Sequence, residues 1–62
     1  MASELLTEVE AAERIGIEPR TLAYLRHRGQ GPAFVRFGSQ IHRYYPDDVD
    51  AWLEASRVVA ER

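Results

Sequence analysis

Cysteine is absent from this 62-residue sequence, and so is any long apolar run. Without cysteine there is no disulfide framework and no thiolate metal site, and the two histidines, His27 and His42, lack zinc-ligand spacing. No apolar stretch approaches the ~20 residues of a membrane span, and the N-terminus lacks the basic and apolar regions of a signal peptide. We therefore expect a cytoplasmic protein with no metal, no other cofactor and no membrane contact.

Recognisable catalytic motifs are missing as well. The serines have no His/Asp partners in a motif, and there is no glycine-rich phosphate loop. The carboxylates Asp47, Asp48 and Asp50 are explained more simply by the first turn of a helix than by a cation site. The sequence therefore indicates no enzyme. Its length allows a single domain, residues 1–62, with a small core.

Lysine is absent too, and all eight Lys and Arg positions are occupied by arginine. We attribute this to a GC-rich genome more than to planar recognition of phosphate or guanine, but the clustering of the arginines is a separate observation. The net charge of −2 conceals −4 over residues 1–18, +5 over residues 19–46 and −3 over residues 47–62. Because local potential attracts phosphate, the central basic band favours a nucleic-acid contact, with the acidic ends facing away.

Two short helices joined by a turn at Gly16 are predicted in the first half of the chain. Thr7 and Glu10 match a capping box that starts the first helix, and Gly16 stops it. Pro19 suits the first position of the second helix. Small and apolar positions typical of a helix-turn-helix are filled by Ala11, Ala12, Ile15, Ile17, Leu22 and Leu25. A plain pair of core helices would explain these positions equally well, but it would not explain the arginines.

A hairpin and a third helix are predicted in the second half. β-branched and aromatic residues flank Gly38-Ser39, which predicts a tight turn with Gly38 at its first central position. That turn places Val35, Phe37, His42 and Tyr44 on one side and Phe34, Arg36, Ile41 and Arg43 on the other. The sequence alone does not decide which of the two sides is buried. The last helix opens at Pro46. The expected fold class is a small α+β winged helix-turn-helix with two N-terminal helices, a β-hairpin wing and a C-terminal helix. The expected core comprises Leu6, Val9, Ile15, Leu22, Leu25, Phe34 or Phe37, Tyr44, Val49, Trp52 and Leu53.

A stripe of the second helix is the candidate surface for reading DNA. At 100° per residue, Arg20, Ala23, Tyr24 and His27 point away from Leu22 and Leu25. Arginine can bind guanine bidentately, alanine permits close approach, and tyrosine and histidine can reach a base or phosphate. The flanking residues Thr21, Arg26 and Arg28 are better placed for phosphates. In the hairpin, the candidates for the minor groove or its backbone are Arg36, Ser39, Gln40 and His42. The alternative is a merely solvated face.

The ordered set of motifs resembles the MerR-like winged helix-turn-helix proteins of the AlpA and phage excisionase type over residues 6–55. It comprises Leu6-Thr7, Glu10-Ala11-Ala12, Ile15-Gly16-Ile17, Pro19-Arg20-Thr21-Leu22, Arg28-Gly29-Gln30-Gly31-Pro32, Phe34-Val35-Arg36-Phe37-Gly38, Arg43-Tyr44 and Asp48-Val49-Asp50-Ala51-Trp52-Leu53. The resemblance implies a recognition helix at about Pro19–Arg28 in the major groove and a wing at about Ala33–Tyr45 in contact with the minor groove.

The same resemblance implies a biological role. Small excisionases bind repeated sites side by side, bend the DNA and direct a tyrosine integrase toward excision, so the implied partners are double-stranded DNA, an integrase and further copies arranged head to tail. The chain ends at Arg62, without the long dimerising helix of transcription-factor members, which favours this role. One alternative is a small AlpA-like transcriptional regulator. Another is a protein-interaction module that docks through Val58, Val59 and the acidic ends. Replacing Arg20 and Arg26 with alanine should cripple DNA binding in all but the last case. About five neutralised phosphates predict a salt slope of roughly −4 to −5.

Overall fold

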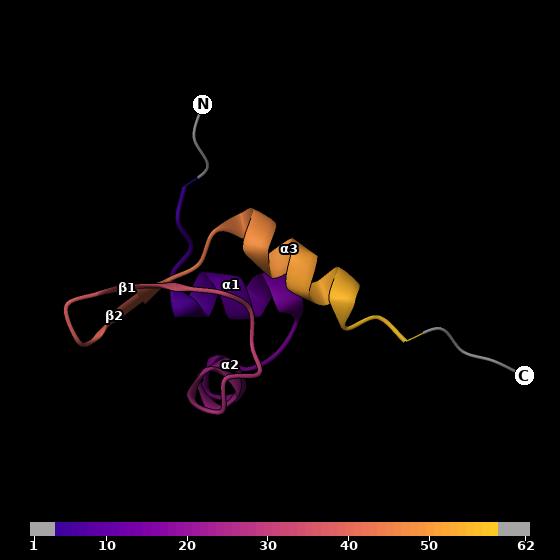
Figure 1. Ribbon diagram of the computed structural model, residues 1–62, viewed down its shortest axis with the longest axis horizontal. Helices are drawn as coiled ribbons and strands as arrows, with labels where there is room; N and C mark the ends of the chain where they lie inside the picture. The colour runs from indigo at the N-terminus through magenta and orange to yellow at the C-terminus, as the bar shows by residue number, and fades with distance from the viewer. Residues whose placement is uncertain (1–3, 59–62) are drawn as a thin grey trace, which may run out of the picture.

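The computed structural model of the protein describes residues 4–58 and contains three helices and a two-stranded hairpin (Figure 1). In chain order these are α1 (Glu8–Ile15), α2 (Pro19–His27), β1 (Val35–Phe37), β2 (Ile41–Arg43) and α3 (Pro46–Ala55). The order of helix, helix, hairpin and helix agrees with the expectation from the sequence. Val59, half of the possible Val58-Val59 docking pair, lies outside the described residues.

The two ends of α1 are fixed by local hydrogen bonds. The amide of Glu10 donates to Thr7 Oγ1 at 3.1 Å, and the amide of Thr7 donates to Glu10 Oε1 at 2.9 Å, which confirms the capping box. The helix stops at Gly16, whose φ of 95° lies in the left-handed region that favours glycine. The Gly16 amide then donates to the Ala12 carbonyl at 2.7 Å. The chain therefore turns sharply and enters α2 at Pro19, as predicted.

The core lies where the elements meet α1. Figure 1 shows α2 almost end-on beneath α1, so the two helices cross, while α3 lies on another side of α1. Small side chains on α1 permit this close approach. The fully buried residues are Ala11, Ala12, Leu22, Tyr44 and Val49, and the apolar side chains packed around them are Leu6, Ile15, Ile17, Phe34 and Leu53. The structure thus has one small core shared by all three helices and the hairpin.

One expected core residue lies on the surface. Val9 is 53% exposed, so the prediction that it is buried is wrong. The reason is that Ala11 and Ala12 occupy the face of α1 that packs against its neighbours. Of the two candidate phenylalanines, Phe34 packs on the core and Phe37 is 46% exposed.

The hairpin has a different turn from the predicted one. Its register pairs Arg36 with His42 and Phe37 with Ile41, which leaves a three-residue loop instead of a two-residue turn. Gly38 is the first loop residue and has a φ of 58°. Because side chains alternate along a strand, one extra loop residue reverses the faces of the second strand relative to the first. The predicted grouping of side chains on the hairpin is therefore wrong.

The observed register also settles which face of the hairpin is buried. Arg36 and His42 share a face with Phe34 and Tyr44, and the rings of Phe34 and Tyr44 lie 6.1 Å apart between centroids. Tyr44 is fully buried, and its backbone pairs with Leu6 through hydrogen bonds of 2.7 and 2.9 Å. The base of this face, at Phe34 and Tyr44, therefore rests on the core and ties the hairpin to the segment before α1, whereas Arg36 on the same face is exposed. The resulting architecture is a small winged helix-turn-helix fold.

Candidate nucleic-acid interface

The predicted stripe on α2 is largely exposed. Arg20, Tyr24 and His27 lie at the surface, and Ala23 is half-buried. Leu22, on the opposite side of the helix, is fully buried in the core. The flanking residues Thr21 and Arg28 are exposed as well. The helical projection of α2 thus places the polar side chains on the solvent side, where a ligand can reach them.

Two of these exposed side chains contact each other. The Arg28 guanidinium carbon lies 5.4 Å from the centroid of the Tyr24 ring, a separation suited to a cation–π contact. This contact holds the arginine beside the exposed tyrosine at the C-terminal end of α2. An aromatic ring next to a guanidinium is suited to contact a base edge and to bind an adjacent phosphate.

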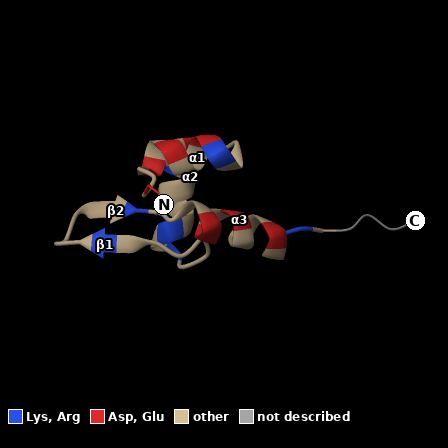
Figure 2. Ribbon diagram, turned by 90° about the horizontal axis from the view of Figure 1, so that it is seen from above, with Lys and Arg blue, Asp and Glu red and all other residues tan. Residues whose placement is uncertain are grey.

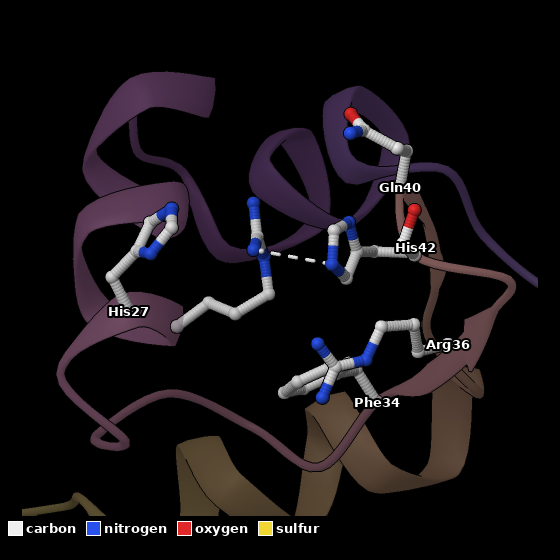
Figure 3. A pocket seen from close by; sticks show the side chains of 7 residues that line it. His27, Phe34, Arg36, Gln40 and His42 are labelled. Atoms are coloured by element: carbon white, nitrogen blue, oxygen red, sulfur yellow. Dashed lines mark hydrogen bonds between the residues drawn. The ribbon is translucent and has the colours of Figure 1, made fainter.

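A groove separates α2 from the hairpin and gathers most of the predicted contact residues. It has a volume of about 590 Å³ and is lined by Arg26, His27, Phe34, Arg36, Ser39, Gln40 and His42. Figure 3 shows His27 on the α2 side and Gln40, His42 and Arg36 on the hairpin side. Six of the seven lining residues are sequence-predicted site residues, although they come from two separate elements. The three-residue loop makes this possible, because it turns His42 to the same face as Arg36.

Phe34 organises the inner part of this groove. Its ring meets His42 edge to face at a centroid separation of 5.6 Å. The guanidinium carbons of Arg36 and Arg26 lie 5.9 and 6.0 Å from its centroid. The Arg36 guanidinium lies over the Phe34 ring in Figure 3. Sequence analysis placed Phe34 only as a possible core residue. It supports the positions of three charged or polar side chains.

Arg26 lies in a different environment from its neighbours on α2. Its Nε and Nη2 atoms donate to the two carboxylate oxygens of Glu8, each at 3.0 Å. The side chains of Arg26 and Glu8 are only 13% and 22% exposed. The Tyr44 hydroxyl donates to the same carboxylate at 3.1 Å. Glu8 of α1 therefore connects α2 to the hairpin, a role that sequence analysis did not predict.

This cluster shifts the acidity of its members. Burial would raise the pKa of Glu8, but hydrogen bonds from Arg26 and Tyr44 outweigh it, so the pKa lies below its usual value and the carboxylate is charged. Burial, reinforced by the nearby Glu8 charge, raises the pKa of Tyr44 to about 12. Desolvation and the neighbouring Arg26 charge lower the pKa of His42. At neutral pH the groove therefore contains a neutral imidazole beside a charged ion pair.

The cations without an ion-pair partner are concentrated on α2 and the hairpin. Within residues 4–58, salt bridges engage Arg14 with Asp50, Arg26 with Glu8 and Arg57 with Glu54. The remaining arginines of that range are Arg20, Arg28, Arg36 and Arg43. Figure 2 shows acidic positions along α1 and α3, and arginine on the hairpin strands. These unpaired arginines, on α2, at its C-cap and on both faces of the hairpin, are suited to attract a polyanion to this part of the molecule.

Other kinds of site receive no support from the described part of the chain. Residues 4–58 contain no group of three or more His, Asp or Glu side chains arranged to hold a metal ion. In the same range no helix has both the length and the apolar character needed to cross a bilayer.

A recognition-type helix, a hairpin beside it and a basic groove between them define a winged helix-turn-helix DNA-binding domain. The sequence pattern of the helix-turn-helix domain family matches residues 5–57, so the chain belongs to that family. Helix-turn-helix domains bind double-stranded DNA in a sequence-specific way and are typically not enzymes. None of the curated proteins compared with the chain matches it.

Proposed function

We propose that this protein is an architectural DNA-binding protein of the MerR-like, AlpA/phage excisionase type. In this proposal α2 enters the major groove and the hairpin contacts the adjacent minor groove or its backbone. Copies bind repeated sites side by side and head to tail, bend the DNA and direct a tyrosine integrase toward excision, in the cytoplasm of a bacterial host. The main support is the groove in which α2 and the hairpin bring their polar side chains together.

The proposed division of labour follows the exposure of each side chain. Arg20, Ala23, Tyr24 and His27 read base edges, because they lie on the stripe opposite the buried Leu22. Phosphate contacts are proposed for side chains that flank this stripe or lie on the hairpin, namely Thr21, Arg28, Arg36, Ser39 and Gln40. The sequence also predicts phosphate contact by Arg26 and DNA contact by His42. In the folded chain, however, Arg26 is bound to Glu8 and to His42.

Binding to a duplex tests the surface itself. A site would first be selected from a randomised duplex library with the native protein, and affinity would then be measured by fluorescence anisotropy over a range of salt. Arg20→Ala should weaken binding by about 1–3 kcal/mol if Arg20 contacts a base. Arg36→Ala should make the salt slope shallower by about 0.9 if Arg36 contacts a phosphate. Arg57→Ala is the matched control, since it removes the same charge outside the groove.

Tandem copies of the selected site test the architectural role. Gel shifts should show a cooperative ladder, and the mobility of circularly permuted fragments should reveal bending. A single non-cooperative complex on straight DNA would refute the excisionase assignment. Promoter binding that changes transcription without an integrase would instead indicate the AlpA-like regulator. A salt slope near zero for the native protein would refute DNA binding through the basic groove and leave the interaction module.

A further inference from the structure

Glu8 is an acidic residue inside a surface that otherwise collects positive charge. It lies at the start of α1, yet its carboxylate reaches Arg26 of α2 and Tyr44 beyond β2. A negative charge at this place weakens the attraction of the surface for phosphate. Beyond repelling phosphate, the Glu8 carboxylate has specific hydrogen-bond partners, and these indicate an additional role.

The first observation is that Nε and Nη2 of Arg26 both donate to the Glu8 carboxylate. The pair is bidentate, which is the strongest geometry for arginine and carboxylate, and both side chains are largely removed from water. If Arg26 moved to a phosphate, Glu8 would keep only the hydrogen bond from Tyr44 and would face the incoming anion. The exchange is therefore unfavourable, even though Arg26 lines the groove.

The second observation concerns the remaining side of Arg26. Its Nη1 atom lies 3.3 Å from Nε2 of His42, the contact marked by the dashed line in Figure 3. A guanidinium has hydrogen-bond donors and no acceptor, so Nε2 must accept this bond. The neutral imidazole then carries its hydrogen on Nδ1. Arg26 thereby fixes both the orientation of the ring and the tautomer of His42.

We propose that Glu8 is a positioning residue of the DNA-binding surface: it holds Arg26 away from phosphates and directs it to orient His42 as a neutral Nδ1–H donor. This inference rests on the proposed function, because it assigns roles within the same surface. Arg26 is then a support for His42 instead of a phosphate contact. The Arg26 cation is thus removed from sequence-independent binding to phosphates. In its place the groove gains the Nδ1–H of His42, a hydrogen-bond donor of fixed geometry.

Replacing Glu8 with an uncharged side chain of the same shape provides the test. Glu8→Gln keeps the shape of the side chain but releases Arg26, while Glu13→Gln removes the same charge from an exposed position on the same helix. Both variants and the native protein would be titrated with a 24-base-pair duplex of random sequence. Relative to Glu13→Gln, Glu8→Gln should steepen the salt slope by about 0.9 and tighten binding about eight-fold at 0.1 M salt, the value for one added phosphate contact. Equal slopes and affinities for the two variants, or weaker binding by Glu8→Gln, would overturn the proposal.

A second measurement uses the native protein and does not depend on the folding of a variant. The ¹⁵N resonances of the His42 ring should report hydrogen on Nδ1. The Nε–H resonance of Arg26 should stay in place when the duplex is added, whereas those of Arg20 and Arg28 should move. An Arg26 resonance that shifts with the other two, or hydrogen on Nε2 of His42, would overturn the proposal. Failure of the native protein to bind the duplex would instead refute the proposed function, so the two failures are distinguishable.

Discussion

Alkaline pH should destabilise the fold through a single buried hydroxyl. Tyr44 is fully buried and donates its hydroxyl hydrogen to Glu8, so removing that proton would place two negative charges side by side in the core. Burial, together with the Glu8 charge, raises the pKa of Tyr44 from 10.0 to about 12. A group with a raised pKa in the folded state stabilises the protein below its unfolded-state value, and the contribution is lost as the pH rises through the folded-state value.

The size of the effect follows from the two pKa values. One pKa unit corresponds to about 1.36 kcal/mol, so at pH 11 the unfolding free energy should be about 1.4 kcal/mol lower than at pH 9 because of Tyr44 alone. Urea denaturation followed by the fluorescence of Trp52, the single tryptophan, measures this free energy at each pH. In the variant Tyr44→Phe this pH-dependent loss should disappear.

Tyr24→Phe is the matched control, because the Tyr24 ring is 57% exposed and lies outside the core. This variant should lose stability between pH 9 and pH 11 as the native protein does. The reasoning is refuted if Tyr44→Phe and the native protein lose the same free energy over this interval. In that case the ionisation of another group would control the alkaline transition.

Other features of the fold lead to further predictions. Leu22→Ala should lower the unfolding free energy by about 2–5 kcal/mol, because it opens a cavity in the core, and an unchanged urea midpoint would show that Leu22 is not a core anchor. Thr7→Ala should cost about 1 kcal/mol by removing the cap of α1, with Thr7→Ser as the tolerated control in the same melt. Gly38→Ala should cost about 1–2 kcal/mol, since φ is positive there, and thermal melts would reveal equal stability if the loop relaxed. The pKa of Glu8 lies below its ordinary value of 4.5, so Glu8 adds stability above that pH, and this stability should be lost as the pH falls further; Glu8→Gln should lack this acid dependence in urea titrations.

The boundaries of the helices were predictable because their signals are local. Thr7 and Glu10 cap α1 through hydrogen bonds that span three residues, and Gly16 ends it by a backbone conformation of its own. Pro19 and Pro46 each occupy the first helical position, where their missing amide costs nothing. None of these features depends on how distant parts of the chain pack. A sequence therefore contains enough information to locate them.

The register of the hairpin was not predictable in the same way. Gly38-Ser39 is compatible with a two-residue turn, and the local sequence does not distinguish that turn from a loop that also includes Gln40. The observed register brings Phe34 and Tyr44 onto one face, where they pack together on the core. Whether the hairpin has a two-residue turn or a three-residue loop thus depends on contacts with the helices. Since the side chains of a strand alternate, an error of one residue was enough to separate Arg36 from His42 in the prediction.

The charge pattern of residues 19–46 indicates where the arginines cluster but not how many of them are left without an ion-pair partner. Arg26 belongs to the basic band, yet its partner Glu8 is 18 residues away on a helix that crosses α2. Conversely, acidic residues of the flanking segments are used internally: Glu8 binds Arg26, Glu10 caps α1 and Asp50 binds Arg14. A sum over a segment treats all these charges as equally available to a ligand. In the folded chain, the crossing of the helices removes one cation from the basic band, and the four arginines of residues 4–58 that form no salt bridge all lie on α2, at its C-cap or on the hairpin. The tertiary structure, and not a sum of charge over a segment, therefore determines which arginines of residues 4–58 are left for a polyanion to contact.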